Sequence, residues 1–207
     1  MEKFLKDLHK LNIPNLPNSV EEFIQIEELD LSNQKIQRLP DEICELTNLK
    51  RLNLSCNEID WLPRDFRKLK NLVKLGLCNN RRLASVDEIA DLKNLQWLNI
   101  SGSRNFELPS LANLQKLKTL YMQNTGAYER DIRVILEAEN IEVLDISVND
   151  FHNIDRLDEL PNLKYFAFDK GIMFEVPNWL KNNSEWEYTI NVVQCFYDVY
   201  IFRKKIN

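Results

Sequence analysis

One spacing dominates this sequence of 207 residues. Residues 26–40 read IEELDLSNQKIQRLP, and residues 49–63 read LKRLNLSCNEIDWLP, which is the same pattern 23 positions later. The frame L-x-x-L-x-L-x-x-N-x-L starts at gaps of 22 to 24 residues, at Ile26, Leu49, Leu72, Leu95, Leu117, Ile141 and Leu163. Self-similarity at a period of this length is typical of solenoids, in which each repeat packs only against its neighbours.

The fourth and sixth positions of the frame are apolar in every repeat. Because side chains alternate along a strand, these two positions face one side, and positions three, five and seven face the other. A strand this short cannot bury an apolar face alone, so successive strands must stack in parallel to make a continuous core. The pattern predicts an α/β solenoid with a curved parallel sheet on its concave side and helices and turns on its convex side.

The frame resembles the leucine-rich repeat family over about residues 26–180. The L-P pair that opens several return segments, together with the 23-residue period, is similar to the subclass of Ras-suppressor-like and bacterial repeat proteins. This resemblance implies about seven repeats. By further resemblance, the expected function is the binding of another protein through the concave face.

The ends of a solenoid expose its core unless they are covered. Residues 1–25 are predicted to form a helical N-terminal cap, because Phe4, Leu5, Leu8 and Leu11 make an apolar helical stripe. Residues 181–207 are rich in aromatic and β-branched side chains, which favours one or two capping strands. The alternative is that these strands pair two chains. Between the caps, residues 127–144 lack the L-P turn and have helical spacing, so we expect a longer convex helix there.

Positions three, five and seven of each frame are predicted to place their side chains on the concave floor. Trp97, Tyr121 and Tyr165 stand among them, and exposed aromatic residues dominate binding hot spots. The alternative is that these rings cover one another laterally. Arg51 and Lys74 could bind an acidic partner. The alternative is that they pair with Glu28 and Asp30 on neighbouring strands. The predicted protein-binding residues are Trp97, Tyr121, Tyr165, Arg51, Lys74, Asp145 and Asn99.

The residues that catalysis would require are scattered. The two histidines, His9 and His152, fall in the N-terminal cap and in a distant loop, and the four glycines form no phosphate-binding loop. None of the four cysteines forms a CxxC pair, which argues against a structural zinc site. Gly76 could leave a gap in the floor where a ligand approaches the backbone. We therefore expect no enzyme, no cofactor and no metal.

Charge and hydropathy restrict the partners. The net charge is −5 and the basic residues are dispersed, so nucleic acid is disfavoured, and no apolar run is long enough to span a membrane. Two alternatives to a simple binding module stay open: a regulator of an enzyme such as a GTPase or phosphatase, and a structural protein that assembles through its C-terminal strands. We expect a monomer, or a dimer through those strands. The absence of a readable signal peptide favours a cytoplasmic protein, or one delivered to a host cell.

Overall fold

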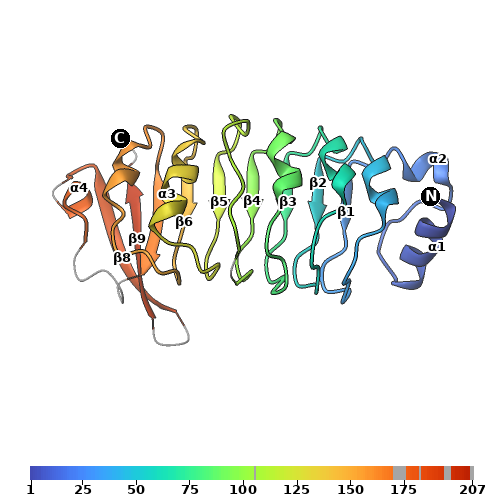
Figure 1. Ribbon diagram of the computed structural model, residues 1–207, viewed down its shortest axis with the longest axis horizontal. Helices are drawn as coiled ribbons and strands as arrows, with labels where there is room; N and C mark the ends of the chain where they lie inside the picture. The colour runs from blue at the N-terminus through green and yellow to red at the C-terminus, as the bar shows by residue number, and fades with distance from the viewer. Residues whose placement is uncertain (105, 170–175, 182, 194–196, 206–207) are drawn as a thin grey trace.

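The structure is a computed structural model that describes residues 1–104, 106–169, 176–181, 183–193 and 197–205. The chain forms an elongated stack with the N-terminal helices at one end and the C-terminal strands at the other (Figure 1). One parallel run follows the chain order: β1 (Glu28–Asp30), β2 (Arg51–Asn53), β3 (Lys74–Gly76), β4 (Trp97–Asn99), β5 (Thr119–Tyr121), β6 (Val143–Asp145) and β7 (Tyr165–Asp169). The predicted α/β solenoid is therefore confirmed.

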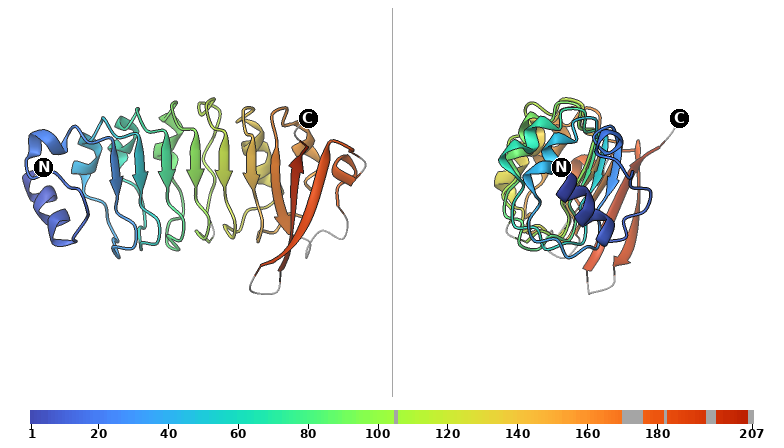
Figure 2. Two further views of the ribbon diagram at one scale, coloured as in Figure 1. Left: turned by 180° about the vertical axis from the view of Figure 1, so that it is seen from behind. Right: turned by 90° about the vertical axis from the view of Figure 1, so that its right-hand side faces the viewer.

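The convex side of the stack is formed by short helices and turns that connect the strands. In the described ranges, four of them are 3-10 helices: η1 (Asp41–Glu45), η2 (Arg64–Lys68), η3 (Asp87–Asp91) and η4 (Asp155–Glu159). The repeat that lacks the L-P turn carries the α-helix α3 (Glu129–Leu136), as its helical spacing predicts. Figure 2, in its end-on view, shows the turns nearly superimposed, with the C-terminal strands along one side. Each turn therefore adds one strand and one convex segment to a common core.

Apolar columns fill that core. Leu75, Leu98 and Leu120, which occupy the fourth frame position in β3 to β5, are fully buried. Ile43 and Phe66 from the convex helices are equally buried and belong to the same core cluster. Burying an aliphatic or aromatic side chain of this size stabilises the fold by about 1.5–3 kcal/mol. Since every repeat contributes to the same columns, the register of the sheet is fixed along the whole stack.

Buried asparagines at the ninth frame position join neighbouring turns. The Asn57 amide donates to the Leu31 carbonyl at 2.8 Å, and its Oδ1 accepts from the Gln34 backbone N–H at 3.0 Å. Asn149 bridges its own turn to the preceding one in the same way. Its own backbone N–H donates to Asp169 Oδ2 at 3.1 Å. Asp169 thus extends this ladder by one turn toward the C-terminal end.

Two different caps close the stack. At the N-terminal end, α1 (Glu2–Lys10) and α2 (Val20–Phe23) pack through the Phe4 and Phe23 rings, whose centroids are 5.7 Å apart. Leu11, predicted as part of the buried stripe, is 38% exposed because α1 ends at Lys10.

At the other end, β9 (Tyr197–Lys204) pairs antiparallel with β7, β8 (Trp186–Val193) is outermost, and α4 (Asn178–Lys181) lies between β7 and β8 in the chain. No helix in the described part of the chain is long and apolar enough to cross a membrane.

Candidate functional site

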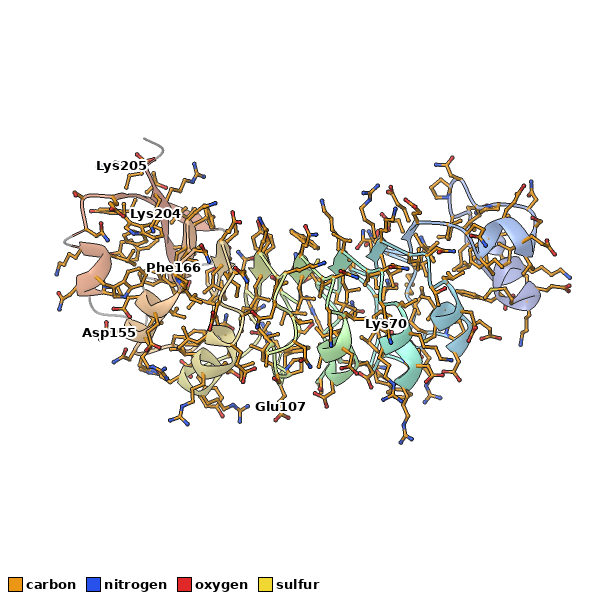
Figure 3. The ribbon with its side chains drawn as sticks, turned by 90° about the horizontal axis from the view of Figure 1, so that it is seen from above. Lys70, Glu107, Asp155, Phe166, Lys204 and Lys205 are labelled. Carbon is orange, nitrogen blue, oxygen red and sulfur yellow. The ribbon has the colours of Figure 1, made fainter. Side chains whose placement is uncertain are left out.

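The concave floor is one side of the parallel sheet. Figure 3 shows the helical segments along one side of the stack and both caps projecting beyond the sheet on the other. The parallel register places Arg51 beside Lys74, and Lys74 beside Trp97. Asn99 is likewise beside Tyr121, and Tyr121 beside Asp145. The predicted residues therefore form one lateral band across the sheet.

The N-terminal half of this band lines a groove of about 740 Å³. The cap loop at residues 13–17 forms one wall of the groove. Four of the predicted binding residues line it: Arg51, Lys74, Trp97 and Asn99. The other three, Tyr121, Asp145 and Tyr165, lie further along the sheet, so the predicted site is divided into two halves.

The basic residues of the groove differ in their pairing. Arg51 forms an ion pair with Glu28 on the neighbouring strand, as the cross-strand alternative predicts. The Lys74 ammonium has no ion-pair or hydrogen-bond partner among the described residues. Asp30, its other predicted partner, instead accepts from the Ser32 backbone and from the Asn53 amide. Lys74 is therefore a free cation at the groove.

The floor at Gly76 is closed by protein. A Cβ at Gly76 would lie 2.8 Å from Asn53 Oδ1 and 3.0 Å from Ser55 Oγ. The Asn53 amide occupies this space because its Oδ1 accepts from the Ser55 backbone N–H at 3.1 Å and its Nδ2 donates to Asp30 Oδ2 at 3.1 Å. Glycine at this position therefore accommodates a neighbouring side chain, while Gly76 itself lies in the lining of the groove.

The three aromatic residues are half-buried, and they do not form one cluster. The Trp97 and Tyr121 rings meet edge to face, with centroids 5.9 Å apart and an interplanar angle of 65°. This contact agrees with the alternative that the rings cover one another laterally. Tyr165 lies two strands beyond Tyr121, and the Arg203 guanidinium from β9 is 5.7 Å from its ring centroid. Each ring keeps part of its surface in the concave face.

Asp145 was predicted as a surface residue, and that prediction is wrong. It is only 5% exposed, because neighbouring polar groups pack against its carboxylate. Its Oδ1 accepts from the backbone N–H and the hydroxyl of Ser147 at 3.0 and 2.6 Å, and its Oδ2 accepts from Gln123 Nε2 at 2.5 Å. Burial raises the pKa of Asp145 above its ordinary value, and these hydrogen bonds partly oppose the rise.

Asp169, two positions beyond Ala167 on the next strand, was not among the predicted site residues. It is 6% exposed, and burial, with the Asp145 charge as a smaller cause, raises its pKa to about 6. Its Oδ1 is buried and has no hydrogen-bond partner among the described residues. Its place in the frame marks it as a concave residue, but burial of its carboxylate depends on packing that the frame does not encode.

The histidines remain separate. His9 Nε2 contacts the Pro17 carbonyl in the cap, whereas His152 lies in a loop beside Glu129. Cys44 is buried, and burial raises the pKa of its thiol to about 12, so it is not a reactive thiolate. Among the described residues, no group of three or more His, Cys, Asp or Glu side chains could hold a metal ion. Cys195 lies outside the described residues.

Parallel strands, a convex helical wall and an asparagine ladder define a repeat protein of the solenoid class. The family described as a leucine-rich repeat region matches residues 5–189, and the chain belongs to that family. A search of curated proteins finds no match.

Among solved structures, an internalin from Listeria monocytogenes has 21% identity and a TM-score of 0.50, covering 70% of this chain and 48% of its own. A leucine-rich repeat protein of Leptospira interrogans has 24% identity and a TM-score of 0.52, covering 78% of this chain and 53% of its own.

A plant peptide hormone receptor, RGFR1, solved in complex with RGF2, has 25% identity and a TM-score of 0.55. That match covers 70% of this chain and 24% of the receptor chain. This chain therefore spans about half the length of the two bacterial structures and a smaller part of the receptor. These similarities support a protein–protein interaction module.

Proposed function

We propose that this chain is a non-catalytic module that binds a segment of another protein in its concave face. The observation that carries the proposal is the groove of about 740 Å³ between the cap loop and the sheet, with the unpaired Lys74 and the half-buried Trp97 in its lining. An unpaired cation beside an aromatic ring offers a partner both a charge and an apolar contact.

The volume of the groove is suited to binding a ligand. Its volume falls within the range of roughly 300–1,000 Å³ that ligand pockets occupy. Lys74 and the Arg51–Glu28 pair give it a polar rim, whereas Trp97 supplies the type of side chain that dominates binding hot spots. The similarity to a peptide hormone receptor solved in complex supports a peptide-like ligand on this fold.

Site-specific photocrosslinking tests this proposal. A benzophenone amino acid replaces Trp97 in one variant and Trp61 in a matched control. Trp61 suits the control because it is an exposed tryptophan, 49% accessible, that lies beside the convex helices. We expect a defined protein adduct from position 97 and none of the same identity from position 61. Equal adducts from both positions, or none from position 97, would move the binding site away from the concave face.

A second candidate function is self-assembly through the outermost strand. Within the described sheet, β8 pairs only with β9, so one of its edges is left without a neighbouring strand. An unpaired edge of eight residues is a template for a second chain. Analytical ultracentrifugation over a wide concentration range tests this function: a mass that stays at one chain excludes it. A doubling that is lost in Tyr188→Pro supports it, because the register places the N–H of Tyr188 on the free edge of β8.

A further inference from the structure

The C-terminal half of the concave band holds two buried carboxylates on neighbouring strands. Asp145 ends β6 and Asp169 ends β7, and the register places Ala167 directly beside Asp145. The donors that reach Asp145 are the backbone and hydroxyl of Ser147 and the amide of Gln123. Every one of these donors is neutral, and so are the backbone N–H groups that reach Asp169.

Because all of these donors are neutral, the negative charges of Asp145 and Asp169 have no cation beside them within the described ranges, and some carboxylate lone pairs have no donor there. An ionised carboxylate offers about four acceptor sites, of which Asp145 fills three with the hydrogen bonds above. Asp169 Oδ1 has no partner in the described part of the chain although its residue is 94% buried. Among these residues, neither carboxylate forms an ion pair. Buried charges are ordinarily paired, so this arrangement lacks a cation.

Aromatic rings flank the same carboxylates. Tyr121 lies directly beside Asp145 in the sheet, and Tyr165 lies diagonally across from it beside Val143. Ala167, on the other side of Asp145, is small and leaves the carboxylate without a bulky neighbour on that strand. The Tyr165 ring already attracts one guanidinium, that of Arg203, at 5.7 Å. Rings of this kind bind planar cations through their negative faces.

We infer that this cluster, defined as Tyr121, Asp145, Tyr165 and Asp169, is the seat of an arginine side chain supplied by the protein segment that binds the concave face. The guanidinium pairs with the Asp145 carboxylate between the two tyrosine rings. Arginine fits better than lysine because its guanidinium carries five N–H donors in a fixed planar fork, and its flat, weakly hydrated head stacks on aromatic rings. This inference rests on the proposed function, because it specifies what one part of the partner must carry.

The direct test uses a minimal probe. Nα-acetyl-arginine amide is titrated into ¹⁵N-labelled protein near pH 7.5, which is above the pKa of about 6 of Asp169, and amide shifts are followed by NMR. Nα-acetyl-citrulline amide has nearly the same shape without the charge and serves as the matched ligand. We expect saturable millimolar shifts at the amides of Tyr121, Gln123 and Asp145, and binding of citrulline that is weaker by about tenfold or more.

Two variants locate the effect. Asp145→Asn, which keeps an acceptor for Ser147, is expected to weaken arginine binding by about tenfold or more, and Tyr165→Leu to weaken it by several fold. Lys93→Gln, beside the convex helix η3 and outside the concave band, is expected to leave it unchanged. If Asp145→Asn fails to fold, Tyr165→Leu still tests the seat. Equal binding of arginine and citrulline, no saturable shift in the millimolar range, or unchanged binding in the variants would overturn the inference.

Failure of this inference and failure of the proposed function give different results. If the arginine probe does not bind but the crosslink from position 97 persists, the concave face binds a partner that carries no arginine at this cluster. If the probe binds but no crosslink forms, the cluster recognises a cation and the proposed binding mode in the groove is wrong.

Discussion

Replacing Gly76 by alanine tests how closely the concave floor is packed. Gly76 has an ordinary strand conformation in β3, so a glycine-to-alanine change there would normally stabilise the fold by about 0.4–1 kcal/mol through the unfolded chain. The added methyl, however, would lie 2.8 Å from Asn53 Oδ1, and that amide would have to turn away. Turning it breaks the hydrogen bonds to the Ser55 backbone and to Asp30.

The magnitude follows from these two opposing effects. Two neutral or singly charged hydrogen bonds at a partly exposed site contribute about 1 kcal/mol each. Set against the gain of about 0.4–1 kcal/mol, Gly76→Ala should lower the free energy of unfolding by about 1 kcal/mol. In an Asn53→Ala background only the contact with Ser55 Oγ at 3.0 Å remains, and rotation of that hydroxyl relieves it, so the same change should raise that free energy by about 0.5 kcal/mol.

The assay is urea unfolding of the four proteins of this double-mutant cycle, followed by circular dichroism. The sign change between the two backgrounds is the diagnostic result, because it does not depend on the absolute stability of the chain. A stabilising effect of Gly76→Ala in the wild-type background, or the same effect in both backgrounds, would refute the conclusion that glycine is there to accommodate Asn53.

The remaining predictions concern the ladder and the buried carboxylates. Asn80→Ala removes an amide that donates to the Leu54 and Leu77 carbonyls and accepts from the Ile59 N–H, so unfolding should require about 3 kcal/mol less. The exposed Asn71→Ala, which loses one bond to the Thr47 carbonyl, should cost under about 1 kcal/mol in the same denaturant titration, and equal losses would contradict the ladder. Because the pKa of Asp169 is raised from 3.8 to about 6, its folded form holds a proton more tightly, and the stability this provides is lost as pH rises through that window. Asp169→Asn should therefore become more stable relative to wild type as pH rises from about 4 to about 7, and parallel pH profiles would contradict this. Glu142 has the opposite sign, since hydrogen bonds from Lys118 and Lys164 lower its pKa to about 2 and its contribution is lost as pH falls. Glu142→Gln should therefore be less stable than wild type at neutral pH, and the difference should shrink as pH falls from about 4.5 toward 2, which urea unfolding across this pH range measures.

The repeating frame predicts the sheet because its physical cause is local. Apolar residues at alternate positions, repeated every 22 to 24 residues, can be buried only by stacking parallel strands, and the register of Leu52, Leu75 and Leu98 follows from that alone. The helical segment α3 was equally predictable from the spacing of Ile132 and Ile135. The direction in which each strand side chain points is thus encoded in the sequence.

The burial of those side chains is not encoded in the same way. Asp145 points to the concave side as predicted, but Gln123 from the preceding turn and Ser147 from its own turn enclose the carboxylate. Gly76 appears as an empty position in the frame, yet the Asn53 amide fills it. The cap loop that walls the groove contributes residues from outside the repeats altogether. These features depend on contacts between turns, which a pattern within one repeat cannot specify.

The central claim is that a partner protein binds the concave face, and affinity capture with matched variants tests it most directly. Wild type, Trp97→Ala/Tyr121→Ala and Trp61→Ala are immobilised at equal density after circular dichroism confirms that all three are folded, and captured proteins are quantified by mass spectrometry. Trp61 is a suitable control because it is an exposed tryptophan that lies outside the concave band. The account predicts a partner that is retained by wild type and by Trp61→Ala and lost by the double variant. A partner retained by the double variant, or lost equally by Trp61→Ala, would contradict it.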